Sequence, residues 1–527
     1  MYDIVIKNGM VADGVTDNLN RADVVIMGDK IATVAPNVSE GLAKKVVDAT
    51  DMVVAPGFVD VHSHSDYYLL IDPRAESKLL QGVTTDVGGN CGYSAAPMSG
   101  ALRERRIKDY QTQFGIDVSW SNLEEYFESL SRKGHGINYA ALLGYNTIRG
   151  SVLGENNSQP DADSMKKLKA AVAEGLDQGA VGMSVGVVYP PACFASEDEF
   201  AQVFSVVGGR DKVFATHIRS EGPGLLESLT EVVNVARRSC ARLQVSHLKT
   251  AGKANWNKLD RAFEILEGAM GEGMKVMADR YPYLASNTGL QVVLPDRAFD
   301  GGKEALLKRL GNSADREAFS RDIITNHPEA EYWETVMVSQ VVNPKNRDLE
   351  GLTVAQGAQL RKKSPHDFVF DLLAEEDAYV EAIFFCMSED NLDRILKKPY
   401  VMVGSDAGAR ALTGPLAIGK PHPRTYGTFP TFLQKYVREK KQISIPEAVK
   451  KTSSMAARFF GLVGRGEITP GSFADIVIFD PATVGDNSTY TAPIAPPSGI
   501  QNVFVNGRLA VENGRLAGEL AGQVITN

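Results

Sequence analysis

VVAPGFVDVHSH, residues 53–64, is an apolar run that ends in two histidines, His62 and His64. In a β-strand, residues i and i+2 point to the same side, so both imidazoles can face one metal ion. A His-x-His pattern by itself is a weak signal, because it is equally compatible with a structural or incidental role. Its meaning therefore depends on the segments that surround it.

Seven further apolar runs follow this one, and helical stretches separate them. One such stretch, SMKKLKAAVAEGLDQG (164–179), has apolar residues at three- and four-residue spacing and ends at a glycine. The seven runs are VTTDVGG (83–89), INYAALLGYN (137–146), AVGMSVGVVY (180–189), KVFATHIR (212–219), LQVSHLK (243–249), KVMADRYPY (275–283) and YVMVGSD (400–406). This alternation predicts an α/β fold with a TIM-like (β/α)8 barrel over residues 56–460, and it disfavours a doubly wound sheet.

Both ends of the chain are rich in predicted strands. Residues 1–55 and 461–527 contain short alternating runs, and Asn-Gly and Gly-Asp turn signals separate those of the N-terminal end. We expect the two ends to form one small β-sandwich domain. Residues from about 290 to 344 break the β/α rhythm, so we expect an insertion near the barrel mouth there. One apolar run, VEAIFFCMSED (380–390), has no place among the eight strands: either it is an additional strand or one of the eight is miscounted.

The composition is that of an ordinary globular protein, with 43% hydrophobic and 23% charged residues among 527. A net charge of -9 gives no overall basic surface for nucleic acid or an anionic membrane. The first residues lack the apolar core of a secretory signal, and no stretch approaches the length of a membrane span. The four cysteines are few and scattered, which favours a reducing compartment. We therefore expect a cytoplasmic protein that acts on a small molecule.

Six residues of metal-binding type stand at the carboxyl ends of predicted barrel strands, where barrel enzymes keep their active residues. They are His62, His64, Cys91, His217, His247 and Asp406. Imidazole, thiolate and carboxylate are the usual ligands of zinc, and a catalytic zinc leaves one position for water. His217 or His247 taken singly is more typical of a hydrogen-bonded core histidine, but the joint placement predicts a zinc site. Asp406 is then a candidate general base.

Several motifs narrow this prediction further. PGFVDVHSH (56–64) and PGSFADIVIFDP (470–481) resemble the amidohydrolase superfamily. GGNCG (88–92) and HPRTYGTFP (422–430) resemble one of its branches, the N-acyl-D-amino-acid deacylases or D-aminoacylases. The resemblance covers nearly the whole chain, and it implies a zinc-dependent enzyme that cleaves N-acyl-D-amino acids into a carboxylate and a D-amino acid. The preference for D over L substrates rests on this resemblance alone.

The same resemblance implies how the metal is held. Cys91 takes the place of the carboxylated lysine that bridges the metals in dihydroorotase-like relatives. Together with His217 and His247 it is expected to hold one tightly bound zinc.

A second, weaker or vacant metal site is implied beside the first. Its residues are His62 and His64, with Cys91 and Asp406 nearby. Asp406 is expected to act first as the general base and then as the acid that delivers a proton to the departing amine.

The α-carboxylate of such a substrate needs a cation in the site. Arg424, in HPRTYG, can form a two-pronged hydrogen-bonded pair with it. Lys249 stands two residues beyond His247 and can point to the same side of its strand. Tyr189 and Tyr281 match family positions that contact this carboxylate.

Two departures from the family pattern bear on the substrate. The loop between Asp406 and Arg424 is longer than usual in the family, and Asn287 stands where the family often has a small hydroxyl residue. Arg297 stands where many members have an aromatic residue. If Arg297 faces the side-chain pocket, it selects an acidic side chain such as that of D-glutamate or D-aspartate.

Two other functions remain open at this point. A cyclic amide hydrolase of the hydantoinase or dihydroorotase type shares the barrel and metals, but it normally has a bridging lysine. A non-catalytic binding barrel is expected to have lost ligands or the base. The acyl group, the number of bound metals and the oligomeric state stay undetermined by the sequence.

Overall fold

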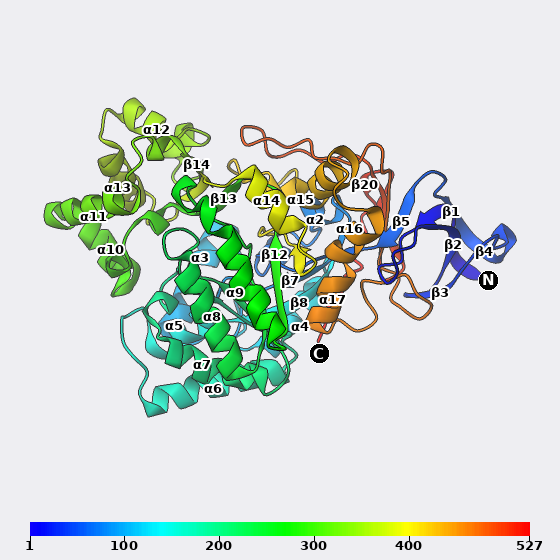
Figure 1. Ribbon diagram of the computed structural model, residues 1–527, viewed down its shortest axis with the longest axis horizontal. Helices are drawn as coiled ribbons and strands as arrows, with labels where there is room; N and C mark the ends of the chain where they lie inside the picture. Colours follow the sequence, from blue (N-terminus) through cyan, green and yellow to red (C-terminus); the bar gives the residue numbers. More distant parts are fainter. Residues whose placement is uncertain (527) are drawn as a thin grey trace.

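The computed structural model describes residues 1–526, and its centre is an eight-stranded parallel sheet curved into a nearly closed barrel (Figure 1). Its strands, in spatial order, are β6 (Phe58–Asp60), β7 (Val83–Gly88), β8 (Asn138–Gly144), β9 (Gly182–Gly186), β10 (Val213–His217), β11 (Arg242–Val245), β12 (Val276–Arg280) and β16 (Val401–Val403). Each of the eight predicted runs contributes one strand, so the predicted (β/α)8 barrel is confirmed.

The first and last barrel strands, β6 and β16, are the two ends of this sheet. A parallel bridge between Ser63 and Ala407 lies just beyond them, and the Asp406 N–H donates to the carbonyl of His62 at 2.8 Å. The barrel therefore closes at a seam where the segments after β6 and β16 meet. We call this region the seam below.

Amphipathic helices follow the barrel strands in the order that the sequence indicates. They include α4 (Leu123–Lys133), α5 (Tyr145–Leu153), α6 (Ala162–Asp177), α7 (Glu197–Gly208), α8 (Leu225–Ser239), α9 (Leu259–Gly271), α14 (Glu389–Leu396) and α16 (Ile445–Thr452). On α8, Leu229, Val232 and Ala236 are buried at three- and four-residue spacing, which is the pattern of a helix with one face on the core.

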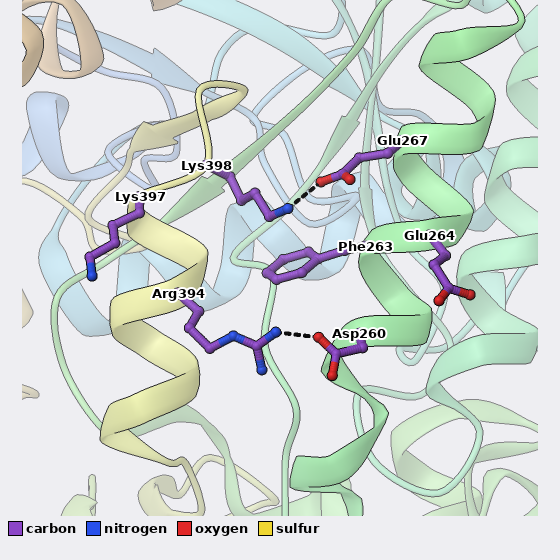
Figure 2. Close-up of a pocket in the computed structure, with 7 residues that line it drawn as sticks. All are labelled: Asp260, Phe263, Glu264, Glu267, Arg394, Lys397 and Lys398. Atoms are coloured by element: carbon purple, nitrogen blue, oxygen red, sulfur yellow. Dashed lines mark hydrogen bonds and ion pairs between the residues drawn. The ribbon is translucent and has the colours of Figure 1, made fainter.

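A surface groove of about 500 Å³ lies between α9 and α14, and Figure 2 shows its lining. Lys398 pairs with Glu267 at 2.5 Å, and Arg394 pairs with Asp260. These ion pairs neutralise most of the charge of the groove. None of the residues that line it is among those predicted to bind metal.

A second, nine-stranded sheet is built from both ends of the chain. Its strands are β1 (Tyr2–Val11), β2 (Asn20–Met27), β3 (Lys30–Ala35), β4 (Ala43–Asp48), β5 (Val53–Pro56), β17 (Ile476–Phe479), β18 (Ile500–Val505), β19 (Arg508–Glu512) and β20 (Arg515–Leu516). β5 joins the two halves by pairing antiparallel with β17. The β-rich unit formed by both termini is therefore present as a separate sheet.

The run VVAPGFVDV, expected to be a single barrel strand, is divided between the two sheets. β5 belongs to the nine-stranded sheet and β6 to the barrel, with Gly57 between them. A Cβ at Gly57 would lie 2.2 Å from Thr84 Oγ1, so only glycine allows this close approach to the next strand. The predicted start of the barrel at residue 56 lies next to this change of sheet, although the run is equally apolar on both sides of it.

The insertion extends further than the expected range of about 290–344. It has a three-stranded sheet of β13 (Ala285–Gly289), β15 (Glu381–Phe385) and β14 (Val336–Gln340), in that order. Its helices are α10 (Gly302–Leu310), α11 (Ser313–Asn326), α12 (Val354–Arg361) and α13 (Pro365–Glu375). The run 380–390 is thus an additional strand, and the count of eight barrel strands is right. It reads like a barrel strand because β15 is the central strand of a sheet with its own core.

The insertion and the nine-stranded sheet lie at opposite ends of the molecule (Figure 1). Within residues 1–526, the structure contains no helix of the length and apolar character that a bilayer span requires.

The separate core of the insertion can be tested with two leucines. Leu373 on α13 is fully buried, whereas Leu360 on α12 is 52% exposed. We expect Leu373→Ala to lower the free energy of unfolding by about 2–5 kcal/mol, because it leaves a cavity. Leu360→Ala is the control and should change it by no more than about 0.5 kcal/mol. Urea unfolding measures both, and equal effects would show that α13 does not belong to a packed core.

Candidate metal centre

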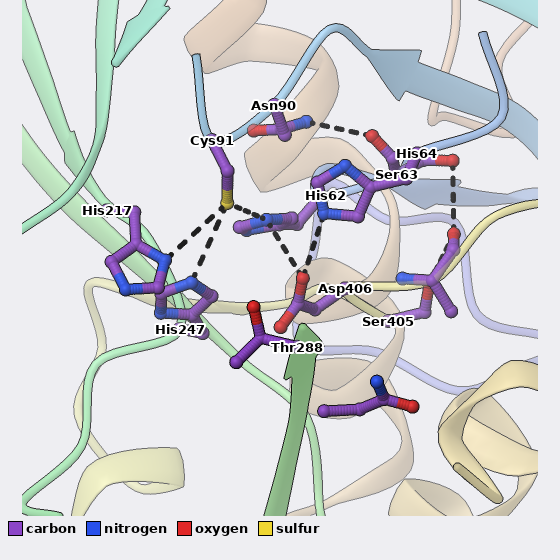
Figure 3. A network of polar contacts seen from close by, with 12 residues as sticks. His62, Ser63, His64, Asn90, Cys91, His217, His247, Thr288, Ser405 and Asp406 are labelled. Carbon is purple, nitrogen blue, oxygen red and sulfur yellow. Dashed lines mark hydrogen bonds and ion pairs between the residues drawn. The ribbon is translucent and has the colours of Figure 1, made fainter. Parts of the chain in front are cut away.

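The six residues predicted to bind metal come together at the carboxyl end of the barrel (Figure 3). His62 and His64 follow β6, and Cys91 follows β7. His217 is the last residue of β10. His247 lies in the segment after β11 and Asp406 in the segment after β16. Because parallel strands end at one rim, residues far apart in the sequence share one site.

Cys91 Sγ is the common atom of two ligand groups. It lies 3.3 Å from His62 Nε2, and 3.8 Å from both His217 Nδ1 and His247 Nε2. The first group, of the size that one metal ion can occupy, is Cys91, His217 and His247. Its thiolate and imidazole atoms are ligands that zinc prefers.

The second group contains Cys91 together with His62, His64 and Asp406, and its ligand atoms lie within 4.8 Å of one another. Asp406 Oδ1 is 3.3 Å from His62 Nε2 and 3.0 Å from His64 Nε2. One carboxylate, two imidazoles and a shared thiolate also suit zinc. The donor chemistry therefore fits two neighbouring metal positions.

The electrostatic surroundings keep the anionic ligands ionised. Burial alone would raise the pKa of the Cys91 thiol, but the neighbouring His62, His217 and His247 imidazoles hold it well below its usual value. Burial also acts to raise the pKa of Asp406, but Arg424 and the neighbouring imidazoles together hold it well below its usual value. Arg424 Nη1 lies 2.8 Å from Asp406 Oδ2. The thiolate and the carboxylate are the forms that can bind a cation.

Three of these residues have an uncommon backbone conformation. Cys91, His247 and Asp406 have φ values of 52°, 37° and 53°, in the left-handed region that few residues other than glycine adopt. Such conformations persist only where the surroundings impose them, and they cluster at functional sites. Gly92 shows the same constraint beside Cys91, since a Cβ there would lie 1.8 Å from Asn146 Oδ1.

Two carboxylates that the sequence did not predict contact His62 and His247 on the side away from Cys91. Asp279 Oδ1 lies 3.1 Å from His62 Nδ1 and accepts a hydrogen bond from the backbone N–H of His247 at 3.0 Å. Glu221 Oε1 lies 2.9 Å from His247 Nδ1. Such contacts leave the other ring nitrogen free for a metal. Asp279 stands near the carboxyl end of β12, so its position on a barrel strand was the signal available in the sequence.

Comparison with known proteins gives this geometry a family. Residues 45–184 and 225–511 match the model of the Amidohydrolase family. The chain is also 32% identical over 524 residues to a D-aminoacylase of Alcaligenes xylosoxydans xylosoxydans, covering 99% of this chain and 97% of that protein. The chain belongs to the amidohydrolase family. Its resemblance to the D-aminoacylases, inferred from sequence motifs, is therefore confirmed.

Two solved structures have the same fold as this amidohydrolase over its whole length. A crystal structure of D-aminoacylase matches with a TM-score of 0.83 at 32% identity, and the match covers 100% of both chains. An N-acyl-D-glutamate deacylase from Bordetella bronchiseptica, complexed with zinc and a phosphonate inhibitor, matches with a TM-score of 0.82 at 29% identity, also over 100% of both chains.

Four of the five residues predicted to bind substrate lie in or next to the predicted metal centre. Arg424 pairs with Asp406, and its guanidinium lies 4.7 Å from the centre of the Tyr281 ring. The Tyr189 ring lies 4.9 Å from that of His217.

Lys249, the fourth of these residues, is buried close to the same ligands. Its ammonium lies 2.8 Å from His247 Nδ1 and also forms an ion pair with Glu221. Lys249 therefore has an anionic partner within the protein before any substrate arrives.

Arg297 is the fifth residue, and the structure does not bring it to the site. It stands in a short 3₁₀ turn of the insertion, is 54% exposed and pairs with Asp322 on α11. Its guanidinium lies 5.6 Å from the Phe319 ring, within the same insertion. The expectation that Arg297 faces the side-chain pocket is therefore not supported. Asn287 likewise turns its side chain away, to Glu381, while its carbonyl accepts from Arg424 at 3.1 Å.

The tight packing of the Cys91 loop can be tested at Gly92. An added methyl at Gly92 clashes with Asn146, whereas one at Gly28 meets nothing within 4 Å, although both glycines have positive φ. We expect Gly92→Ala to displace Cys91 and to retain clearly less zinc after dialysis than the wild type. Gly28→Ala, the control for backbone strain, should retain the wild-type amount. Equal zinc content in both variants would show that the loop does not position the thiolate.

Proposed function

We propose that the protein hydrolyses the amide bond of N-acyl-D-amino acids with the help of zinc, releasing a carboxylate and a D-amino acid. The observation that carries the proposal is the Cys91 thiolate shared between two ligand groups, one of which contains Asp406. It occurs in a chain that is 32% identical to a D-aminoacylase over 99% of its length.

Two zinc positions of unequal strength fit the ligand groups. Cys91, His217 and His247 would hold the tightly bound zinc, and His62 and His64, with Cys91 and Asp406, would form the weaker site. Bound zinc supplies Lewis-acid polarisation of the acyl carbonyl and of the attacking water. Glu221 and Asp279 orient the histidines from the opposite side.

Asp406 is the proposed proton carrier. Its carboxylate is ionised, because Arg424 and the neighbouring imidazoles hold its pKa well below the usual value despite burial. It can therefore take a proton from the attacking water, whose oxygen bonds to the acyl carbon. The C–N bond then breaks, and Asp406 returns the proton to the departing amine nitrogen.

The α-carboxylate of the substrate would be bound by Arg424, Lys249, Tyr189 and Tyr281. The Tyr281 hydroxyl is buried and has no hydrogen-bond partner within residues 1–526, so it is available to donate to an incoming oxygen. Buried hydroxyls normally have partners, and an unpaired one beside Arg424 supports an anion-binding role. A preference for acidic side chains was expected from Arg297, and its exposed position removes that support.

The two rival functions are less well supported. A cyclic amide hydrolase normally has a bridging lysine, whereas here the Cys91 thiolate is the atom common to both ligand groups. A non-catalytic barrel is expected to have lost ligands or the base, whereas all six predicted ligands, including an ionised Asp406, are present here. The four cysteines carry no disulfide within the described chain, which is typical of a reducing compartment, and we propose the cytoplasm.

The reaction can be tested with N-acetyl-D- and N-acetyl-L-amino acids and the zinc-loaded protein. We expect turnover of the D series and a loss of about 100-fold or more in kcat for Asp406→Asn, which removes the proton carrier. Asp348→Asn, on the surface of the insertion, is the control and should keep wild-type activity. Turnover of cyclic amides alone, or an Asp406→Asn variant as active as the wild type, would contradict the proposal.

The unequal strength of the two metal positions gives a separate prediction. After removal of metal with a chelator and titration with zinc, the wild type should bind one zinc tightly and a second more weakly. His217→Ala should lose the tight site, whereas His64→Ala should keep it and lose only the weak one. Metal analysis after equilibrium dialysis measures this. Equal losses in the two variants would show that the positions do not differ.

A further inference from the structure

Lys78, the third residue of the short helix α2 (Glu76–Leu79), is a lysine with no exposure to solvent. Its ammonium has three N–H donors, and each has an acceptor. The acceptors are Asp60 Oδ2 at 2.5 Å, Ala407 O at 2.9 Å and Ser405 Oγ at 3.0 Å. Buried lysines are rare unless they are paired, because an ammonium is strongly hydrated in water. The contacts of Lys78 are therefore a specific feature of this site.

The acceptors of Lys78 lie on opposite sides of the seam. Asp60 is the last residue of β6, whereas Ser405 and Ala407 follow β16. The Ser405 N–H also donates to Asp60 Oδ1 at 2.9 Å, so the two sides are tied together directly as well. Lys78 thus joins the first barrel strand to the last.

Asp406 stands between the two residues that Lys78 holds. Its backbone is in the left-handed region, and its N–H donates to the carbonyl of His62 across the seam. A residue in this conformation needs support from its neighbours. Lys78 provides it on both sides, through Ser405 and Ala407.

A second buried carboxylate extends the same network to the histidine loop. Asp86 Oδ2 lies 3.6 Å from the Lys78 ammonium and accepts the hydroxyls of Ser63 and Ser65, each at 2.6 Å. These two serines flank His64 in the sequence. One buried cation therefore acts on both the Asp406 segment and the segment that carries His62 and His64.

We propose that Lys78 is a positioning residue, which holds Asp406 at its working distance from His64 without touching the substrate. The proposal rests on the function proposed above for Asp406. Lys78 acts on Asp406 indirectly, through Asp60, Ser405 and Ala407.

Lys451 provides a matched control. It is also a buried lysine, and it donates to the carbonyls of Lys398 at 2.6 Å and Val401 at 3.1 Å. Val401 is the first residue of β16, so Lys451 anchors the end of this strand that lies away from Asp406. The two lysines support the same strand, but only Lys78 supports the end that carries the proposed proton carrier.

The first experiment compares the zinc-loaded full-length variants Lys78→Met and Lys451→Met. We expect Lys78→Met to lower kcat on the order of 100-fold through misplacement of Asp406, with KM little changed. Lys451→Met should lower the melting temperature and keep kcat near the wild-type value. Lys78→Arg, which retains the charge, should restore part of kcat. A wild-type kcat in folded Lys78→Met, or equal losses in both methionine variants, would overturn the proposal.

A second readout does not depend on activity. In crystal structures, Lys78→Met should move Asp406 Oδ1 away from its 3.0 Å contact with His64 Nε2, and Lys451→Met should leave that contact intact. If the wild type cleaves no N-acyl-D-amino acid, the proposed function fails, while the position of Asp406 still decides the role of Lys78. An unmoved Asp406 overturns that role.

A milder variant covers the case in which Lys78→Met does not fold. Ser405→Ala removes one hydroxyl and leaves the buried charges in place. It should show the same shift of Asp406 and about tenfold lower kcat, since the hydrogen bonds of this hydroxyl with Lys78, Asp60 and Ala407 are lost. A wild-type position and kcat in Ser405→Ala would count against the proposal.

Discussion

The carboxylate of Asp60 accepts backbone N–H groups from both sides of the barrel seam, from His62 at 3.2 Å and from Ser405 at 2.9 Å. β6 and β16 are short strands at the ends of the sheet, so side chains complete a closure that a strand ladder provides elsewhere. His64 and Asp406 are 342 positions apart in the sequence, and this closure is what brings their side chains into contact. The second ligand group therefore depends on the seam, whereas the first, on β7, β10 and β11, does not cross it.

The parallel barrel explains why so much of the centre was predictable. Each predicted ligand stands at the end of an apolar run. In a parallel barrel all such runs end at one rim, so residues at different strand ends are neighbours in space. His217 and His247 are examples, because each taken singly is more typical of a core histidine, and only their shared position at strand ends predicts a metal site. The same reasoning fails for Arg297, which lies in the insertion, where no repeating strand geometry fixes which way a side chain points.

Other features were hidden because their signals are not local. Glu221 lies in the loop after β10 and Lys78 lies on α2, and only packing shows that both side chains are directed inward. Likewise, β15 has the apolar character of a barrel strand, since Ala382 and Ile383 are buried in a sheet that forms beyond the barrel. The hydrophobic pattern of a strand indicates that the strand is buried, but it does not indicate which of two cores the strand belongs to. The role proposed for Lys78 could therefore be recognised only from the structure, which places Asp60 and Ser405 beside it.

The centre combines backbone strain with buried charge, and both lower the stability of the fold. A left-handed conformation at Cys91, His247 and Asp406 costs on the order of 1–3 kcal/mol at each residue. The buried cations Lys78, Lys249 and Arg424 each face a carboxylate, since an unpaired buried charge would cost more still. A substrate carboxylate that reaches Arg424 or Lys249 must therefore compete with Asp406 or Glu221. With the roles proposed above, substrate binding would be an exchange of anionic partners around fixed cations. The geometry of those pairs would then govern both the affinity for substrate and the ability of Asp406 to carry a proton.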